Sequence, residues 1–222
     1  MVDIRVTDLT EMNAGNFCLA GWDQAGQRMV RPLPNGGNWT MAMLQHFGIV
    51  PGTLLRITPS GNANGEYPHM TEDTRIELGA STSISAQAMQ WFGPNAPKTA
   101  ATMADAFQGQ LQHNKQFRGV NQGNYVARGA QSRSLWGVAI PRANVSFSTE
   151  FDKLKATVVD ASGTYQLAVS SHALKEIWRN GGVQAIQRAL PQSGQLHVRV
   201  GLARAYNVAP DRCSAMVNGV YW

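Results

Sequence analysis

Short runs of alternating apolar and polar residues, separated by turns rich in Gly, Asn and Asp, recur along the chain. Runs with this period of two are typical of half-buried β-strands. Two stretches, beginning near Ile4 and Leu154, share one order: short strands, a helical segment, then further strands. This order predicts a mainly β protein with α insertions, built from two OB-like small β-barrels packed together.

The second stretch follows the OB order closely. Strands are expected within residues 145–160, 165–170, 195–203 and 215–222, and helices within 172–190. Ser171 is a helix cap, and Gly181 with Gly182 interrupts the helical pattern. A helix between the third and fourth strands of a five-stranded barrel is the OB arrangement. We therefore assign residues 145–222 to the second barrel, and residues 1–81 with 134–144 to the first.

Residues 82–133 form an insertion of different character. Helical spacing predicts one helix near residues 83–92 and another at 99–111, where Met103, Phe107 and Leu111 lie four residues apart. Residues 112–133 are polar, basic and rich in Gly and Gln, which is typical of a long surface loop. The insertion is thus expected to be helical first and a loop afterwards.

Charge and cysteine content narrow the function classes. The 222 residues carry a formal charge of +5, which favours an acidic partner such as nucleic acid. Cys18 and Cys213 are expected to be reduced core thiols, because no CxxC or HxxxH spacing accompanies them. We expect no metal site and no cofactor.

The chain shows no targeting signal. Its first residues lack the basic-then-apolar pattern of a signal peptide, and no apolar run approaches the ~20 residues that span a bilayer. We therefore expect a cytoplasmic protein without a membrane partner.

The densest polar cluster runs from Pro68 to Asp73. His69, Glu72 and Asp73 can contact a ligand there, or act as local hydrogen-bonding groups near a turn. The other histidines form no spaced pair, so we predict no catalytic residue. A metal-dependent hydrolase remains a minor alternative.

Arg31 lies at the end of a predicted strand, near a barrel mouth, and Arg199 and Arg204 flank Gly201 in a later strand. An arginine at a strand end can fork onto a phosphate. Alternation places Val198 and Val200 on the core side, which leaves Arg199 outward and free to meet a ligand. The alternative is a salt bridge at the surface or between domains.

The basic segment 112–133 is the other candidate nucleic-acid contact. Basic side chains interleaved with aromatic rings suit contact with a nucleic-acid backbone and stacking on bases. The residues concerned are Lys115, Arg118, Arg128 and Arg133, with Phe117 and Tyr125 between them. A flexible surface segment or a partner-docking arm is the competing interpretation.

Several motifs, in this order along the chain, resemble the dual OB-containing domain family. They are Val6-Thr7-Asp8-Leu9-Thr10-Glu11-Met12, Cys18-Leu19-Ala20-Gly21, Arg31-Pro32-Leu33, Pro68-His69-Met70-Thr71-Glu72-Asp73, Arg199-Val200-Gly201-Leu202-Ala203-Arg204, and the run from Cys213 to Tyr221. The resemblance does not cover residues 92–133. It implies two OB barrels and a role in nucleic-acid or nucleotide recognition, often in bacterial conflict systems.

Two function classes follow. The first is a non-catalytic module that recognises nucleic acid, with single strands favoured, or a nucleotide, as the sensing subunit of a prokaryotic defence system. The second is a protein-interaction subunit that scaffolds or regulates an effector encoded nearby. Phosphate contacts release counterions, so a salt-dependent binding constant separates the two.

Overall fold

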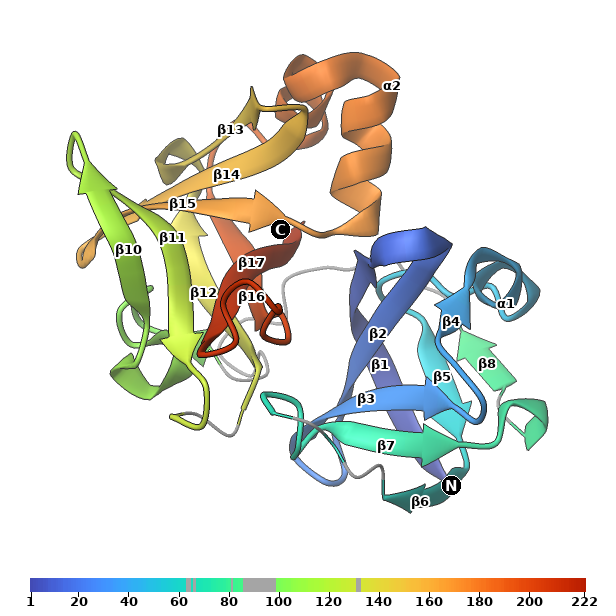
Figure 1. The fold of residues 1–222 in the computed structure, drawn as a ribbon. Coiled ribbons are helices and arrows are strands. Elements are labelled where there is room, and N and C mark those ends of the chain that lie inside the picture. Colours follow the sequence, from blue (N-terminus) through green and yellow to red (C-terminus); the bar gives the residue numbers. More distant parts are fainter. Residues whose placement is uncertain (63–64, 66, 81, 86–98, 131–132) are drawn as a thin grey trace.

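The computed structural model of the protein describes residues 1–62, 65, 67–80, 82–85, 99–130 and 133–222. These residues form two curled β-sheets, one for each half of the chain, with short helices at their edges (Figure 1). The expected class, mainly β with two small barrels packed together, is confirmed.

The first barrel is a meander of three strands that two later strands close. Its elements are β1 (Val2–Glu11), β2 (Asn16–Asp23), β3 (Arg28–Pro34), β4 (Trp39–Thr40), α1 (Met41–His46), β5 (Leu54–Ile57), β6 (Pro59–Asn62), β7 (Asp73–Ile76) and β8 (Thr82–Ser85), with 3-10 turns at Asn13–Gly15 and Leu78–Ala80. The strand β5 pairs with β1, while β7 lies parallel to β3 and antiparallel to β6. The sheet therefore curls back on itself.

The second barrel repeats this arrangement. Its elements are β12 (Leu135–Pro141), β13 (Val145–Glu150), β14 (Lys153–Asp160), β15 (Gly163–Val169), α2 (His172–Ala189), β16 (Gln195–Leu202) and β17 (Arg212–Tyr221). As β3 runs parallel to β7 in the first barrel, β15 runs parallel to β17 in the second. Ser171 caps α2, and Gly182, at φ 66°, breaks its helical geometry where the sequence predicted an interruption.

The assignment of residues 134–144 to the first barrel is wrong. The strand β12 pairs with β16 along its whole length, so it belongs to the second sheet. A 3-10 turn at Arg142–Asn144 bends the chain between β12 and β13, and β13 then pairs with β14. The two segments together act as one long, bent first strand of the second barrel.

The helices predicted within residues 82–111 are not found where the structure describes the chain. Residues 82–85 form strand β8, residues 86–98 lie outside the described part, and β9 (Thr99–Ala100) pairs with β12. Within the described residues of this range, the helical part is a 3-10 turn at Ala106–Gly109, and it does not continue as an α-helix because Phe107 and Gln108 have positive φ, 56° and 60°. Met103 and Phe107 are nevertheless fully buried in the second core.

The loop predicted at residues 112–133 is largely a β-hairpin. Strands β10 (Gln112–Phe117) and β11 (Val120–Ala127) pair antiparallel around a two-residue turn. Arg118 and Gly119 both have positive φ, 49° and 77°, as a primed hairpin turn requires. The strand β11 pairs with both β15 and β17, so it widens the wall of the second barrel.

Each barrel has its own apolar core. Ile4, Leu19 and Leu55 belong to the first core, whereas Val158 and Val198 belong to the second. A small third cluster joins Ala20 and Met29 of the first barrel to Leu135 of the second. The two barrels therefore meet through limited apolar contact.

Replacing Gly201 with Val should lower the free energy of unfolding by about 1–3 kcal/mol through overpacking. An added Cβ would lie 2.1 Å from the Nδ2 atom of Asn218, whose Oδ1 accepts a hydrogen bond from Ser170 at 2.9 Å. Denaturant unfolding measures the change. Gly37→Val is the matched control, because Gly37 has no atom within 4 Å of such a Cβ. Equal effects of the two substitutions would contradict the prediction.

Candidate nucleic-acid interface

The cluster predicted from Pro68 to Asp73 is buried between the two barrels. His69, Glu72 and Asp73 are 6%, 4% and 6% exposed. Glu72 accepts a hydrogen bond from the backbone N–H of Ser134 at 2.8 Å, and the Nδ1 atom of His69 lies 2.8 Å from the Ser134 hydroxyl. These side chains thus connect the first barrel to the start of β12.

Arg31 is also buried, at 5% exposure, rather than open at a barrel mouth. Its guanidinium donates to Asp73 at 2.7 Å and to the sulfur of Cys18 at 3.0 Å. The register of the parallel strands β3 and β7 sets Arg31 opposite Asp73. The salt-bridge alternative therefore describes Arg31 better than contact with a ligand.

Burial controls ionisation in this cluster. It raises the pKa of Glu72 to about 7, against the pull of a hydrogen bond from Ser134 and the charge of Arg31. Burial, with the nearby Arg31 and Arg204, lowers the pKa of His69 to about 2. The Ser134 hydroxyl lies between the two side chains: it is 2.8 Å from the Nδ1 atom of His69 and donates to a carboxylate oxygen of Glu72 at 3.4 Å. These contacts make the cluster a structural element of the junction.

Arg199 does point away from the core of its own barrel, as alternation predicted, but it is not free. The first barrel covers it completely, and its guanidinium lies 3.0 Å from the carboxylate of Asp8 in β1. Tyr221 donates to the carbonyl oxygen of Thr7 beside this pair at 2.8 Å. The prediction that Arg199 meets a ligand is wrong, because sequence alternation cannot show which domain covers a face.

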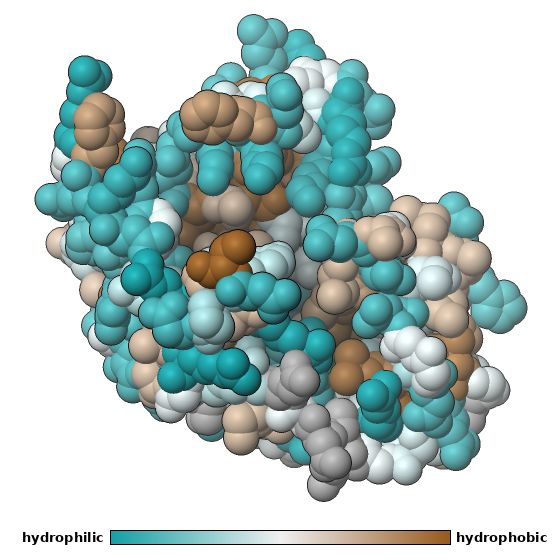
Figure 2. Space-filling model, viewed as in Figure 1, coloured by the Kyte–Doolittle hydropathy of each residue, from teal (hydrophilic) through white to brown (hydrophobic). Residues whose placement is uncertain are grey.

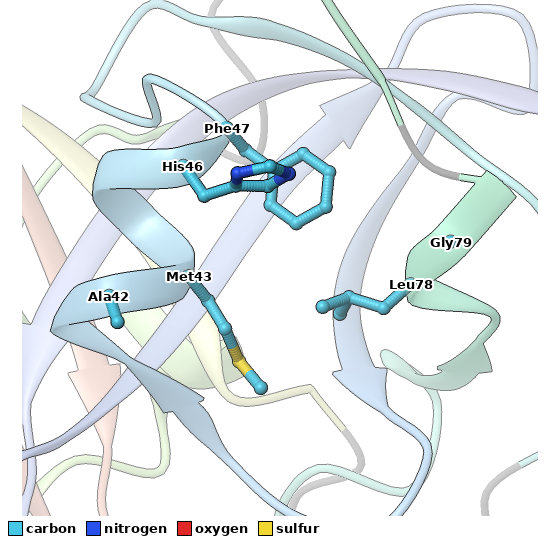
Figure 3. A pocket seen from close by; sticks show the side chains of 6 residues that line it. All are labelled: Ala42, Met43, His46, Phe47, Leu78 and Gly79. Carbon is cyan, nitrogen blue, oxygen red and sulfur yellow. The ribbon is translucent and has the colours of Figure 1, made fainter.

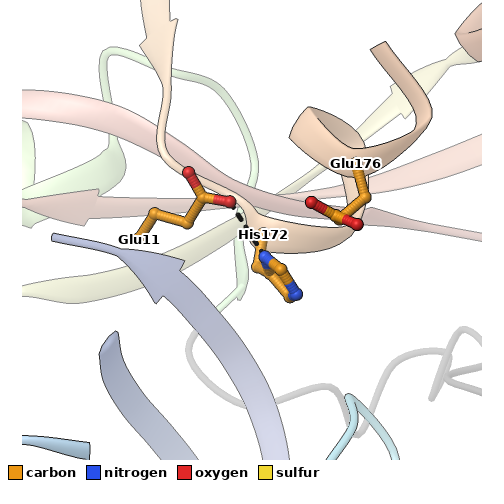
Figure 4. A group of neighbouring side chains, drawn as sticks. All are labelled: Glu11, His172 and Glu176. Atoms are coloured by element: carbon orange, nitrogen blue, oxygen red, sulfur yellow. Dashed lines mark hydrogen bonds and ion pairs between the residues drawn. The ribbon is translucent and has the colours of Figure 1, made fainter. Parts of the chain in front are cut away.

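A third polar group joins the end of β1 to α2. Glu11, His172 and Glu176 bring their ligand atoms within 4.8 Å of one another, as a metal site would (Figure 4). However, Arg179 lies 2.5 Å and Lys175 lies 3.4 Å from Glu11. Burial would raise the pKa of Glu11, but the hydrogen bonds from Arg179 and His172 and the charge of Lys175 lower it to about 2. A dication would be repelled here, so the group is an ionic link between the barrels.

Exposed and half-exposed arginines gather at one end of the second barrel, on four strands that are neighbours in the order β11, β17, β16, β12. Ala127 pairs with Arg212, the N–H of Arg128 donates to Asp211, and the N–H of Leu202 donates to Ser134. The ends of all four strands therefore lie at one edge, where the β11 arrow ends in Figure 1. We call this edge the arginine rim; it comprises Arg128, Arg133, Arg204 and Arg212.

The rim is rich in positive charge over a short distance. Four neighbouring strands span about 14 Å, from three inter-strand spacings. Arg128 and Arg133 are exposed and form no ion pair with another described residue. Arg204 approaches the buried Asp73 at 3.6 Å, and Arg212 approaches the exposed Asp211 at 3.3 Å. The predicted residues Arg128, Arg133 and Arg204 are thus brought together.

Aromatic rings at the rim differ in access. Tyr206, in the loop between β16 and β17, is 57% exposed. Tyr125 is half-buried, and the Arg212 guanidinium lies 4.8 Å from its ring centroid, so one face of that ring is covered. Arg212 was not among the predicted contacts; it lies three residues before the last predicted strand, and this position was the available signal.

The β10–β11 hairpin carries the remaining predicted cations. Lys115 and Arg118 are exposed, and Phe117 is 56% exposed with Arg118 lying 5.2 Å from its ring centroid. Figure 2 shows mostly hydrophilic residues along this projecting hairpin, with an apolar residue near its tip. The tip and the rim lie at opposite ends of β11, so the two basic zones are separate.

An apolar pocket of about 370 Å³ lies on the first barrel, between α1 and the turn after β7 (Figure 3). Its lining residues are Ala42, Met43, His46, Phe47, Leu78 and Gly79. With this lining the pocket suits an apolar group rather than a phosphate.

Comparison with known proteins gives no family. No protein-family model matches the chain, and no curated protein matches it. One similar solved structure is that of a murine DNA-binding protein bound with double-stranded DNA: it is 10% identical, and the match covers 99% of this chain and 95% of that chain with a TM-score of 0.33. A TM-score this low does not show that the two proteins share a function. Among the described residues, no helix is long and apolar enough to cross a membrane.

Proposed function

We propose that the protein is a non-catalytic nucleic-acid-binding module that holds a strand along the arginine rim of its second barrel. The observation that carries this proposal is the arrangement of the rim: four arginines at the ends of four neighbouring strands, beside the exposed Tyr206. OB folds bind oligonucleotides with the loop between their last two strands, which here carries Arg204 and Tyr206.

Single strands are the favoured ligand. A positive groove combined with exposed rings binds single strands, because every base has a face that can stack on an aromatic ring. Tyr206 at the rim and Phe117 on the hairpin supply such rings. The resemblance to the dual OB-containing domain family supports a place as the sensing subunit of a prokaryotic defence system.

The triple substitution of Arg128, Arg133 and Arg212 by Gln should weaken binding of single-stranded oligonucleotides of every sequence alike. Three lost phosphate contacts should lower the slope of log K against log salt by about 2. Fluorescence anisotropy at several salt concentrations measures both quantities. The same measurement with Lys115 and Arg118 both replaced by Gln tells whether the bound oligonucleotide also contacts the β10–β11 hairpin.

A control for this experiment removes the same charge elsewhere. Lys153, Lys155 and Arg188 lie on β14 and α2, away from the rim, and their triple substitution by Gln should leave affinity and slope nearly unchanged. If both triple variants lose affinity equally, only the net charge matters and the rim is not the site. If the unsubstituted protein binds no oligonucleotide at low salt, the proposal fails.

The second candidate function is a protein-interaction subunit. The apolar pocket beside α1 favours it, because Met43, Phe47 and Leu78 there would accept an apolar side chain of a partner. Failure of nucleic-acid binding, together with capture of a neighbouring gene product that survives high salt and is lost in Leu78→Asp, would replace the first proposal by this one.

A further inference from the structure

A polar pocket of about 360 Å³ lies where the first barrel meets the arginine rim. Its lining residues are Leu33, Asn35, Gly36, Gly37, Asn38, Arg75 and Arg204. All but Arg204 come from the first barrel, where Leu33 of β3 pairs with Arg75 of β7. The volume falls in the range of small-ligand sites, about 300–1,000 Å³.

Two arginines, one from each barrel, give this pocket a positive charge. Arg75 is exposed and forms no ion pair with another described residue; its Nη1 atom donates only to the carbonyl oxygen of Pro34, at 3.4 Å. The side chain of Arg204 is 49% exposed, and its Nη2 atom lies 3.6 Å from Asp73. Asp73 is already paired with Arg31, so one carboxylate faces two guanidinium groups and positive charge remains in excess.

The loop between β3 and β4 leaves its main chain accessible from the pocket. Residues 35–38 are all exposed, and neither Gly36 nor Gly37 has an atom within 4 Å of a Cβ position. Gly36 has φ of 90°, a conformation that favours glycine and leaves the main chain accessible. The N–H groups of Asn35 and Gly37 already donate to the carbonyl oxygens of Ile76 and Pro34, so the two arginines supply the main contacts for an anion such as phosphate.

We propose that this pocket binds a phosphate group between Arg75 of the first barrel and Arg204 of the second. The inference deepens the proposed function and rests on it, because Arg204 also belongs to the arginine rim and a strand on the rim would bring a phosphate to the pocket. The phosphate is either an internal one of that strand or a terminal monoester, as in a 5′-phosphorylated end or a mononucleotide. The two arginines of the pocket come from different barrels, so a bound phosphate also holds the barrels together.

The first test uses the full chain and pyrophosphate as the probe, at constant ionic strength set with chloride. Calorimetric titration should show saturable binding, and pyrophosphate should raise the melting temperature. Arg75→Gln should weaken the binding at least about tenfold, because a charge-assisted hydrogen bond contributes more than the energy of a tenfold change in affinity. The matched control Arg188→Gln, an exposed arginine on α2, should bind as the parent does. Absent binding, or equal binding by Arg75→Gln and the parent, would overturn the proposal.

The second test identifies the source of the phosphate with two single-stranded oligonucleotides, one 5′-phosphorylated and one with a 5′-hydroxyl. A preference for the phosphorylated end that Arg75→Gln abolishes supports a terminal monoester. If the parent binds both oligonucleotides with the same affinity, and Arg75→Gln weakens both affinities by the same factor, the pocket binds an internal phosphate. If both oligonucleotides bind the parent and Arg75→Gln alike, the pocket proposal fails while the rim proposal stands. If pyrophosphate binds at the pocket and neither oligonucleotide binds, the rim proposal fails instead.

Discussion

Arg199→Met should lower the free energy of unfolding by about 3–5 kcal/mol, which is the usual result of leaving one partner of a buried ion pair without compensation. The side chains of Arg199 and Asp8 are 1% and 2% exposed, so water cannot solvate the remaining carboxylate. Thr7 also donates to Asp8 at 2.6 Å, but a neutral hydroxyl cannot replace the guanidinium charge. Chemical denaturation measures the loss.

Two further variants distinguish the buried charge from the lost packing. The double variant Asp8→Asn with Arg199→Met contains no buried charge and should recover most of the stability, because a neutral pair carries no desolvation penalty. Arg56→Met breaks the exposed pair of Arg56 with Asp3 and should leave the free energy of unfolding nearly unchanged. A double variant as unstable as the single one would contradict the electrostatic explanation.

Stability should fall as the pH is lowered from 6.5 towards 5. Burial lowers the pKa of His69 and of His197 from 6.5 to about 2, so below 6.5 the unfolded chain binds two protons that the folded chain does not. Each histidine therefore removes about 1.4 kcal/mol of stability per pH unit. Glu72 opposes this: its pKa is raised from 4.5 to about 7, so between these values the folded chain holds a proton that the unfolded chain has lost. The net slope should be about 1.4 kcal/mol per pH unit.

Glu72→Gln should make this slope about twice as steep, since it removes the opposing proton. Glu72 contributes a stability that is present below pH 4.5 and is lost as the pH rises through about 7. The variant should therefore be more stable than the parent at pH 8, by roughly 2–3 kcal/mol. Denaturant unfolding between pH 5 and 8 tests both statements. An unchanged slope would mean that Glu72 is ionised throughout this range.

Local signals in the sequence were sufficient for much of the fold. Strand alternation identified the core side of β16, where Val198 and Val200 are fully buried. The break at Gly181 and Gly182 and the cap at Ser171 lie where the sequence predicted them. These features depend on neighbouring residues only, which is why a single sequence could show them.

The failures concern contacts between distant residues. The hairpin was missed because every residue of β10 is exposed, so no apolar alternation marks the strand. Arg199 is covered by a carboxylate 191 positions away in the chain, and nothing near Arg199 indicates that partner. His69 and Glu72 were chosen as ligand contacts for their chemistry, yet they contact Ser134 across the junction. Of the candidate site, the exposed cations of the rim and hairpin were the predictable part.

The first strand has a consequence for how the chain is made. During translation β1 can enter its own barrel early, because β2, β3 and β5 follow it directly. Its other partners come much later: the carbonyl oxygen of Thr7 accepts a hydrogen bond from Tyr221, 214 positions later, and Asp8 pairs with Arg199, 191 positions later. A nascent chain therefore exposes the Asp8 carboxylate without its arginine partner until β16 has been synthesised. Docking of the two barrels is a step that can only follow the synthesis of β16 and β17.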